Sequence, residues 1–574
     1  MGAVENIITD NLTIWSSAVQ SKSSVGRGTR SKRNLYGVKK LRELILDLAV
    51  RGLLVPQDPN DEPASVLLEK IAAEKEEQIK GGKIKKSKPL PSVEKAEERV
   101  IPTSWEFIRF GAGINVLNGR AYKKNEMLSE GTPLLRVGNL FTSNDWYYSD
   151  LQLEPQKYID NGDLIYAWSA SFGPFIWEGG KVIYHYHIWK LDFYDDMSLS
   201  KNYVYLYLLN ETAAIKASGN GITMVHMTKE RMEKLLLPVP PLVEQHRIVA
   251  KVDELMALCD TLEQQQEDSI KAHETLVEAL LEALTSAIDA DASQAAWQRI
   301  AEHFDVLFTT EHSIDKLKET ILQLAVMGKL VSQDPNDEPA GVLLHRIVAE
   351  KEQLIKDKKI KKYKPSPAVS SEEMSFELPD GWIWCRVWDV ASIITSGSRG
   401  WAKYYSDSGA MFLTMGNLSR GSYTLRMKNI RYVSPPVSGE GKRTSLTEGD
   451  LLISITGDVG NLGLIPSGFG ESYINQHTAL LRLMPECKGR FIAEFMRSPF
   501  AKYQFDAPQR GIKNSFRLGD VGEMIMALPP LLEQYRIVAK VDELMALCDQ
   551  LKDSLQQVQQ TQIHLTDAVV RNAL

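Results

Sequence analysis

Apolar residues recur at alternating intervals of four and three along the C-terminal part of the chain. They follow this spacing through Ile537, Val541, Leu544, Cys548, Leu551, Leu555, Val558, Gln562, Leu565 and Val569. The same spacing occurs in the middle of the chain at Ile248, Val252, Leu255, Cys259 and Leu262, is lost in the polar run QQQEDS, and resumes at Leu276, Leu280 and Leu284. Because only Gln562 interrupts the C-terminal series, the pattern predicts two long coiled-coil helices.

The two predicted helices begin with nearly the same sequence. EQHRIVAKVDELMALCD, from Glu244 to Asp260, and EQYRIVAKVDELMALCD, from Glu533 to Asp549, differ at a single position. We call this segment block B. A second repeat, block A, reads LILDLAVRGLLVPQDPNDEPA from Leu44 and TILQLAVMGKLVSQDPNDEPA from Thr320. Repeats at so long a period are the main clue to the organisation of the chain.

The order of these repeats predicts how the chain closes on itself. It reads block A, a variable segment and block B, and then the same three parts again. In the middle of the chain, block B is followed directly by block A, whereas the two ends hold one block A and one block B separately. If the N- and C-terminal segments meet in space, they form a second copy of the central pair, and the chain acquires a pseudo-two-fold axis. A two-fold symmetric partner, or a pair of identical partners, would suit such an arrangement.

Block A predicts a shorter helix that pairs with block B. Its apolar face consists of Leu41, Leu44, Ile45 and Leu48 in the first copy and of Leu317, Ile321 and Leu324 in the second. Gly52 and Gly328 follow as helix C-cap residues. The plain interpretation of both apolar faces is packing within the chain, which says nothing about function.

The two variable segments predict β-rich domains of one fold. Each opens with a Trp-rich strand (WEFIRF, WIWCRV), followed by a loop of small and basic residues (LNGRAYKK, TSGSRGWAK). GNL, GDL and a histidine-containing run (IYHYHIWKL, YINQHTALL) come next in the same order. Alternating β-branched and aromatic runs between Gly, Asn and Ser turns are typical of strands. We therefore expect an α+β protein in which long antiparallel coiled-coil helices separate two β-rich domains.

The predicted parts divide the chain into helical regions and β-rich domains. They are an N-terminal helical repeat region at residues 1–100, a first β-rich domain at 101–241, a central helical repeat region at 242–377, a second β-rich domain at 378–530 and a C-terminal coiled-coil helix at 531–574.

Composition is that of an ordinary core-forming protein. Of the 574 residues, 43% are hydrophobic and 25% are charged. No apolar run approaches a membrane span, and the N-terminus lacks the layout of a signal peptide. The four cysteines show no CxxC spacing, so we expect reduced thiols and a cytoplasmic location.

Charge is unevenly distributed between the two variable segments. The net charge of −7 argues mildly against a nucleic-acid partner if it is spread evenly. Trp105 to Leu235 contains 13 basic and 15 acidic residues, whereas Trp382 to Pro530 contains 17 basic and 12 acidic residues. The modest excess in the second segment fits a surface that faces DNA.

Taken together, these features resemble the specificity subunits of type I restriction–modification systems. The resemblance covers essentially the whole chain. It rests on the helices PLVEQHRIVAKVDELMALCD and PLLEQYRIVAKVDELMALCD and on the GNL, GDL and QH motifs of the variable segments. The Gln-His pair of the family is present as Gln476-His477, whereas His187 in YHYH departs from it, so the role of His187 is open.

The resemblance implies a DNA-binding subunit without catalysis of its own, in a restriction system that acts in defence against foreign DNA. The β-rich domains at 101–241 and 378–530 would be target recognition domains, each reading one half of a split, asymmetric target in double-stranded DNA, and the helices would fix the gap. Two methyltransferase (modification) subunits and two translocase–nuclease (restriction) subunits would be the partners. S-adenosylmethionine, ATP and Mg²⁺ would belong to those partners, and we expect no cofactor in this chain.

We expect DNA contacts from the basic loops, the Gln-His pair and the last polar loop. The candidates are Arg120, Lys123, Lys124, Arg399, Lys403, Gln476, His477, Arg510, Lys513 and Asn514. The alternative for each basic loop is solvated charge, and the same holds for the repeated KIKK runs. Asn139 and Asn417 stand next to glycine, which favours turn chemistry, and Trp168 and Tyr166 are expected in the core.

A partner is expected to dock on outward-facing residues that both copies of block B share. These are Lys251, Asp253, Glu254, Lys540, Asp542 and Glu543. Packing constrains inward-facing residues, so identical exposed residues indicate the same partner at both copies. Recent duplication is the alternative explanation.

Two other functions stay open as alternatives: a coiled-coil scaffold that does not bind DNA, and a fused restriction enzyme with an unrecognised catalytic site. The sequence contains no GxxxxGK[ST] phosphate loop, no NPP[FY] motif and no FxGxG loop. No metal-ligand spacing accompanies His187 or His477. The bases of the target and the length of the gap do not follow from these motifs.

Overall fold

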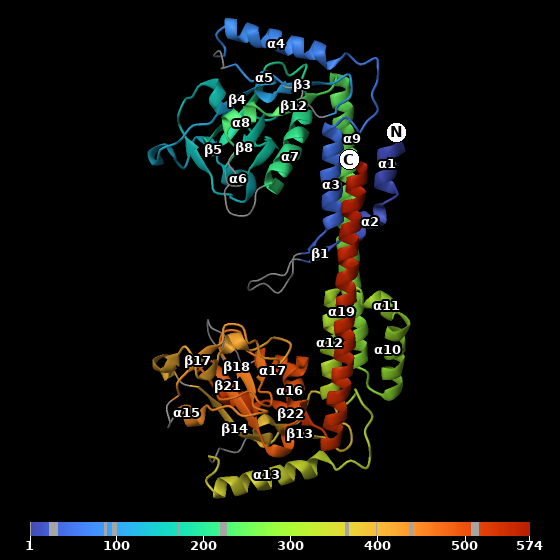
Figure 1. Cartoon of the computed structure of the whole chain (residues 1–574), viewed down its shortest axis with the longest axis vertical. Helices are drawn as coiled ribbons and strands as arrows, with labels where there is room; N and C mark the ends of the chain where they lie inside the picture. Colours follow the sequence, from blue (N-terminus) through green and yellow to red (C-terminus); the bar gives the residue numbers. More distant parts are fainter. Residues whose placement is uncertain are drawn as a thin grey trace. The chain divides into compact units, whose positions relative to one another are not determined.

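The computed structural model describes the chain except for residue 1 and residues 22–32, 85–88, 94–99, 170–171, 219–226, 362–366, 398, 436–439 and 507–515. The chain divides into two compact units (Figure 1). The first unit comprises Met1–Ile270 and Gln557–Leu574, and the second comprises Lys271–Gln556. Each unit has a main hydrophobic core that combines long helices with one β-rich domain.

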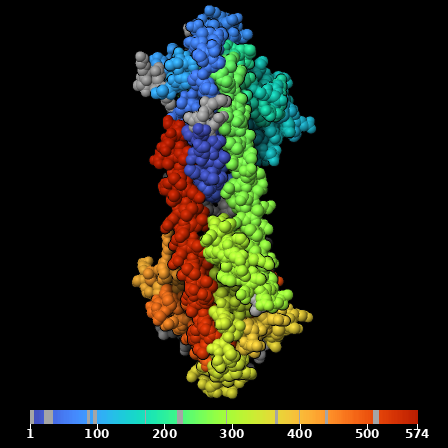
Figure 2. All heavy atoms as spheres, turned by 90° about the vertical axis from the view of Figure 1, so that its right-hand side faces the viewer, coloured from blue at the N-terminus to red at the C-terminus, as the bar shows by residue number. Residues whose placement is uncertain are grey.

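The first unit joins the two ends of the chain. Helices α1 (Gly2–Thr9), α2 (Leu12–Ser17) and α3 (Tyr36–Val50) pack with parts of α9 (Leu242–Thr285) and α19 (Leu531–Ala573), and α4 (Ala64–Lys80) follows the QDPNDEP turn. Val569 and Ala573 of α19 pack on this core, and Tyr36 Oη donates a hydrogen bond to Asp567 Oδ1 over 2.7 Å. Figure 2 shows the end of α19 beside the N-terminal helices. The expected meeting of the N- and C-terminal segments is confirmed.

The second unit repeats this helical arrangement. Its helices α10 (Ala290–Glu302), α11 (Phe304–Leu307), α12 (Glu311–Val326) and α13 (Ala340–Lys356) accompany the end of α9 and the start of α19. Because α9 begins in the first core and ends in the second, while α19 does the reverse, the two long helices are antiparallel. In both units, block A packs with the block B that follows its own β-rich segment.

The predicted coiled-coil series is correct at the start of each helix, and Leu284 of α9 and Val569 of α19 also pack on the cores, but it is wrong at Leu276, Val558 and Leu565. In α19, Val558 and Leu565 are 53% and 47% exposed, whereas Thr566 is buried. In α9, Leu276 is 52% exposed, and the next residue, Val277, is buried in its place. An α-helix has 3.6 residues per turn, so a strict seven-residue pattern drifts by about 20° per heptad and leaves the buried face.

The first β domain contains two four-stranded sheets and a strand pair that closes it. Its strands are β3 Glu106–Arg109, β4 Ile114–Asn118, β5 Thr132–Leu135, β6 Tyr147–Ser149, β7 Tyr158–Ile159, β8 Leu164–Ala167, β9 Gly173–Ile176, β10 Val182–Tyr184, β11 Ile188–Phe193 and β12 Leu236–Val239. The sheet orders are β4-β11-β8-β9, which is antiparallel, and β6-β5-β10-β7, in which β5 and β10 are parallel. β3 pairs with β12, and helices α5 (Phe110–Gly113), α6 (Val137–Phe141), α7 (Lys201–Ser218) and α8 (Lys229–Glu233) complete the domain.

The second β domain repeats most of this topology. Its strands are β13 Ile383–Arg386, β14 Ala391–Ser396, β15 Tyr405–Ser406, β16 Ala410–Leu413, β17 Arg431–Val433, β18 Leu451–Ser454, β19 Leu462–Leu464, β20 Ser472–Ile474, β21 Thr478–Leu483 and β22 Ile525–Leu528. The order β14-β21-β18-β19 matches that of the first domain. In the other sheet, β17-β16-β20 corresponds to β6-β5-β10 with the same parallel pair, but the fourth strand is β15 beside β17 instead of β7 beside β10. β13 pairs with β22, and helices α14 (Val387–Val390), α15 (Glu440–Arg443), α16 (Phe491–Arg497), α17 (Pro499–Asp506) and α18 (Leu518–Glu523) complete the domain. The predicted α+β class with two β-rich domains of one fold is confirmed.

The residues shared by the two halves meet at a junction between block A, block B and the first strand of the β domain. In the second unit, the buried carboxylate of Glu533 accepts hydrogen bonds from Trp382 Nε1 and Gln333 Nε2, each over 3.0 Å. Arg536 forms an ion pair with Asp337 of the QDPNDEP turn at 2.6 Å. Burial raises the pKa of Glu533, and the two donors and Arg536 act against that shift.

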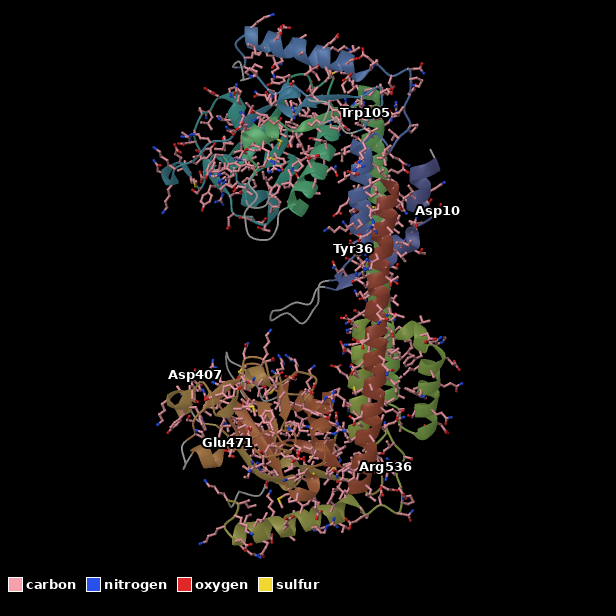
Figure 3. The ribbon with its side chains drawn as sticks, viewed as in Figure 1. Asp10, Tyr36, Trp105, Asp407, Glu471 and Arg536 are labelled. Carbon is pink, nitrogen blue, oxygen red and sulfur yellow. The ribbon has the colours of Figure 1, made fainter. Side chains whose placement is uncertain are left out.

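The first unit contains the equivalent junction. Arg247 pairs with Asp61 at 2.6 Å. Burial raises the pKa of the Glu244 carboxyl, and Trp105, Gln57 and Arg247 act against that shift, although neither carboxyl oxygen has a hydrogen-bond partner among the described residues. Figure 3 labels Trp105 of this junction and Arg536 of the other. The EQxR part of block B is therefore explained by the attachment of each β domain to its own helix.

Two glycines allow block A to approach the β domain closely. Gly52 and Gly328 follow the ends of α3 and α12 with φ of 72° and 71°, as expected for helix C-cap residues. A Cβ atom at either position would lie 2.5 Å from the ring of Pro102 or Pro379 in the IPTSW and LPDGW motifs. Both the backbone conformation and the close contact require glycine.

Candidate nucleic-acid interface

In each β domain the basic loop lies against the turn that contains the histidine. In the first domain, Arg120 N donates to Tyr184 O over 3.1 Å, and Tyr186 N donates to Arg120 O over 3.0 Å. In the second domain, Gly397 N donates to Asn475 O over 3.2 Å. These turns join β10 to β11 and β20 to β21, so both domains build the site from equivalent elements.

A glycine makes this contact possible in both domains. A Cβ atom on Gly119 would lie 2.3 Å from the carbonyl oxygen of His185, and one on Gly397 would lie 2.1 Å from that of Ile474. Such distances are far inside van der Waals contact, so a larger residue would push the loop away from the turn. The glycines of LNGR and TSGS therefore position the basic residues that follow them, a role that the sequence pattern alone does not reveal.

The turn of the first domain is rich in aromatic side chains. Trp168, at the end of β8, donates its Nε1 hydrogen to Tyr186 O over 2.8 Å and contacts His187 edge-on, with ring centroids 5.0 Å apart. Its indole stacks on Trp189 at 5.8 Å, and Trp189 stacks on Tyr166 at 6.0 Å. Tyr166 and Trp189 are buried, whereas Trp168 is only half-buried. The expected core role of Tyr166 is confirmed, while Trp168 ends the stack at the candidate site.

Two histidines of this turn lie close together. The ring centroids of His185 and His187 are 5.0 Å apart. Burial, His187 and Arg136 lower the pKa of His185 to about 4. Its imidazole is therefore neutral at physiological pH and offers one donor and one acceptor. His187 belongs to the aromatic cluster of the turn.

The turn of the second domain holds Gln476 and His477. His477 Nδ1 lies 2.6 Å from Thr456 Oγ1, and Gln476 Nε2 lies 2.8 Å from His477 Nε2. Because an amide nitrogen can only donate, His477 Nε2 accepts and Nδ1 donates to the Thr456 hydroxyl. Asn475 Oδ1 accepts a hydrogen bond from the His477 backbone nitrogen over 3.1 Å. Both nitrogens of the imidazole are held, which fixes the ring orientation.

The basic residues of the first domain differ in whether their side chains are paired within the domain or exposed. Arg120 pairs with Glu126 at 2.7 Å, and its guanidinium lies 5.1 Å from the centre of the Tyr122 ring. Lys123 and Lys124 are exposed. Arg120 is thus held within the domain, and the two lysines are the side chains of this loop that extend from it.

The basic loop of the second domain is more open. Arg399 and Lys403 are exposed at the two ends of a short 3-10 segment, η4 (Arg399–Tyr404), and Lys403 Nζ lies 4.9 Å from the centre of the Tyr404 ring. The predicted contacts Arg510, Lys513 and Asn514 lie outside the described residues, as do parts of both KIKK runs. These positions stay predictions.

Tyr405 and Arg431 extend this surface, although the sequence pattern does not mark them. Tyr405 is 45% exposed, and the Arg431 guanidinium lies 5.5 Å from the centre of its ring. The two residues are on the paired strands β15 and β17. The run WAKYYS, with an aromatic pair beside a lysine, is the signal that could have identified the first of them.

The asparagines of the two GNL motifs have the turn role expected for them. Asn139 Oδ1 accepts a hydrogen bond from Arg136 N over 3.1 Å, and Asn417 Oδ1 accepts one from Thr414 N over 3.0 Å. Asn417 is also buried. Their side chains therefore close the turn after β5 and β16.

The residues predicted to bind a partner form local ion pairs. Lys251 lies 3.0 Å from Glu254, and the repeat pair Lys540 and Glu543 lies at 2.9 Å. Asp253 and its counterpart Asp542 are exposed residues at the same place in the repeat. The docking role of this face stays a prediction.

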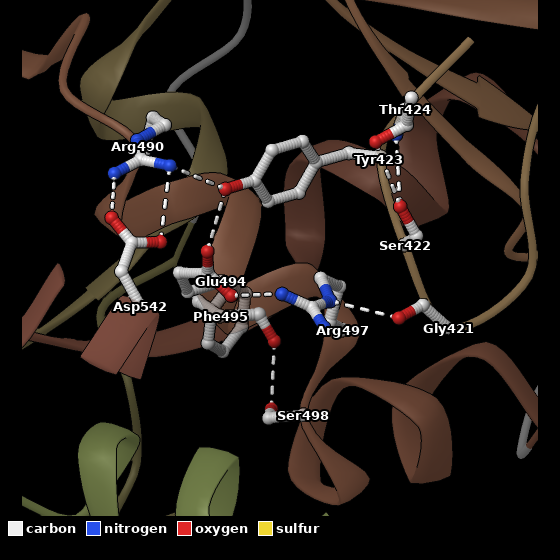
Figure 4. A network of polar contacts seen from close by, with 10 residues as sticks. All are labelled: Gly421, Ser422, Tyr423, Thr424, Arg490, Glu494, Phe495, Arg497, Ser498 and Asp542. Carbon is white, nitrogen blue, oxygen red and sulfur yellow. Dashed lines mark hydrogen bonds and ion pairs between the residues drawn. The ribbon is translucent and has the colours of Figure 1, made fainter. Parts of the chain in front are cut away.

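Asp542 also belongs to a polar network that reaches the second β domain (Figure 4). Arg490 forms an ion pair with Asp542 and donates a hydrogen bond to Tyr423 Oη over 3.2 Å. Tyr423 Oη donates to Glu494 Oε1 over 2.7 Å, and the other oxygen of this buried carboxylate pairs with Arg497 at 2.6 Å. Burial and Glu494 raise the pKa of Tyr423 to about 12. The network fixes α19 to the loop that precedes β17.

Neither a metal site nor a membrane-spanning helix occurs among the described residues. They include no group of three or more His, Cys, Asp and Glu side chains that could hold a metal ion. Within that part of the chain, no helix is both long and apolar enough to cross a membrane. All four cysteines are free and buried, and burial raises the pKa of Cys259 to about 11.

These features define a protein with two unlike binding surfaces on one repeated scaffold. A family model described as the type I restriction modification DNA specificity domain matches residues 102–272. The specificity subunits of the type I restriction enzymes EcoAI and EcoEI, both from Escherichia coli, are each 37% identical to the chain, and each alignment covers 100% of both proteins. A chain in a solved structure of a type I R-M system has 18% identity, with coverage of 83% of this chain and 99% of that one and a TM-score of 0.44. The chain belongs to the family of type I restriction enzyme specificity subunits.

Proposed function

We propose that this chain reads a bipartite, asymmetric DNA target, with one β domain on each half, and so directs methylation and restriction by partner subunits. Recognition of DNA targets is the function of its family. The observation that supports a split target is the pair of equivalent sites: the turn before β11 carries His185 and Tyr186 and contacts Trp168, whereas the turn before β21 carries Asn475 and Gln476 in their place. Two domains of the same fold that present different side chains would read different DNA sequences.

The side chains at the two sites suit contacts with base edges. The amide of Gln476 has the donor and acceptor needed for adenine N7 and N6 in the major groove. Trp168 and Tyr186 offer apolar surface, which suits the methyl group of thymine. Lys123, Lys124, Arg399 and Lys403 would contact phosphates or guanine, with Arg510, Lys513 and Asn514 as further proposed contacts.

The paired helices would set the gap between the two half-sites. α9 has 44 residues, which correspond to a helix about 66 Å long. Two readers on the same face of DNA are separated by about 34–36 Å or a multiple of it. A stiff antiparallel pair of this length can impose such a separation, whereas a flexible linker cannot.

Catalysis would reside in the partners. Two modification subunits would dock on the repeated faces formed by Lys251, Asp253 and Glu254 and by Lys540, Asp542 and Glu543, and two translocase–nuclease subunits would join them. S-adenosylmethionine, ATP and Mg²⁺ would be bound by those partners. Adenine methylation requires the base to leave the duplex, a step that belongs to the pocket of the modification subunit.

Mapping methylated adenines across a genome tests the proposal. A host that carries the modification subunit is compared with and without the gene for this chain. We expect a single motif of two unlike halves at a fixed gap, methylated only when the chain is present. Unchanged methylation, in a host where the complex assembles, would contradict the proposal.

A further inference from the structure

The two β domains differ in charge over one equivalent stretch. Between the glycine of the basic loop and the GDL strand, residues 119–160 contain five basic and six acidic residues, whereas residues 397–447 contain eight basic and two acidic residues. Much of the difference comes from residues 419–433, which contain four basic residues and no acidic residue. The corresponding part of the first domain, around β6, contains Asp145 and Asp150.

The four basic residues of this stretch form an exposed surface. They are Arg420, Arg426, Lys428 and Arg431. Arg420 pairs with Asp458, but both side chains are at least half exposed, at 63% and 50%, and such a pair is weak enough for a phosphate to replace the carboxylate. Figure 1 shows β17 on the side of the second domain that faces away from α12 and α19.

The backbone that carries these residues is held in place. Arg426 N donates to Asn417 O over 2.8 Å, and Asn417 Nδ2 donates to Arg426 O over 2.9 Å. Arg497 Nε donates to Gly421 O over 3.1 Å, and Tyr423 is fixed by the network in Figure 4. A fixed backbone loses little conformational entropy when its side chains bind, so the charges are positioned in advance.

The surface is continuous with the candidate interface of the same domain. β17 pairs with β15, and Arg431 stacks on Tyr405 just after Lys403 and Arg399. We propose that Arg420, Arg426, Lys428 and Arg431 form a phosphate-binding surface that gives the second domain a sequence-independent hold on DNA, without a counterpart in the first domain. This inference rests on the proposed DNA-reading function and adds that the two domains contribute unequally to sequence-independent binding of DNA.

Salt dependence of DNA binding tests the inference. The full chain, assembled with its modification subunits, is titrated with a mixed-sequence duplex of about 40 base pairs at several salt concentrations. Each phosphate contact contributes about 0.9 to the slope of log K against log salt. The variant Arg420→Gln/Arg426→Gln/Lys428→Gln should therefore reduce the slope by about 2 to 3 and leave the methylated sequence unchanged, since phosphate contacts carry no sequence information.

The matched control removes three other exposed cations of the second unit, in Lys271→Gln/Arg299→Gln/Lys502→Gln, and should leave the slope unchanged. Equal effects of the two triple variants, or no effect of either, would overturn the inference. The single variant Lys428→Gln, at an exposed position, should reduce the slope by about 0.9 and keeps the test decisive if the triple variant is unstable. Wild-type protein that binds no DNA at all would instead contradict the proposed function.

Discussion

The two junctions closely resemble each other, whereas the two candidate interfaces differ in their side chains. At the junctions, Arg247–Asp61 and Arg536–Asp337 are the same ion pair at the same distance of 2.6 Å. At the interfaces, equivalent turns carry His185 and Tyr186 in one domain and Asn475 and Gln476 in the other.

The difference follows from burial. A buried carboxylate such as Glu533 must keep its two donors, because an unpaired donor or acceptor in the interior is costly. A side chain on a surface turn has no such constraint once a glycine such as Gly119 or Gly397 holds the turn against the loop. The scaffold can therefore stay the same while each surface acquires its own specificity.

Removal of a junction carboxylate should have the largest effect on stability. Glu533→Ala leaves Trp382 Nε1 without its acceptor and removes one hydrogen bond of Gln333 Nε2, which still donates to Gly328 O over 2.7 Å. This should lower the free energy of unfolding by about 2–4 kcal/mol. Urea denaturation measures the change. Glu244→Ala should act in the same direction in the first unit, and Asp553→Ala, at an exposed position of α19, should change stability by less than about 0.5 kcal/mol. A cost at one junction alone would show that the two are not equivalent.

Charge reversal on the repeated faces should have an intermediate effect, on assembly. Lys251→Glu and Lys540→Glu place two carboxylates beside Glu254 and Glu543 and should weaken docking of the modification subunit by about tenfold. Co-purification and titration of the two proteins measure this. Lys271→Glu lies on α9 outside block B and serves as the control. Wild-type stoichiometry in the double variant would mean that duplication alone preserved these residues.

At neutral pH the smallest expected effect is that of His185 in the first interface, because its influence on stability appears only in acid. His185, with its pKa lowered to about 4, should titrate by NMR well below the usual value near 6.5. Between these values the unfolded chain binds the proton before the folded chain does, so this residue makes stability fall as pH drops from about 6.5 to 4. The variant His185→Gln should lack this contribution to the pH dependence of the free energy of unfolding. Titration of His185 near pH 6.5 would contradict the buried environment described here.

Much of the fold follows from the sequence because periodicity reports burial. The helices, the α+β class and the meeting of the chain ends are all predictable from repeats and from the spacing of residues such as Ile248 and Ile537. The phase of the long helices beyond Leu555 is not, since it depends on how a real helix drifts against its neighbours. That drift buries Thr566 and exposes Leu565.

The candidate site is predictable in its parts but not in its assembly. Loops and histidines can be recognised one by one, as can the turn role of Asn417. The contact of Gly397 with Asn475, and the hold of Thr456 on His477, join residues distant in the chain that only the folded structure brings together. For the same reason Arg431 becomes part of the site only through its pairing with the strand that carries Tyr405.

The most direct test of two independent readers is replacement of one of them. Residues 101–241 are exchanged for the corresponding domain of another family member, and methylated sites are mapped in a host that supplies the modification subunit. If each domain reads its own half-site, one half of the methylated sequence changes while the other half and the gap stay the same. A motif altered in both halves, or in neither, from an assembled and active complex would contradict the account.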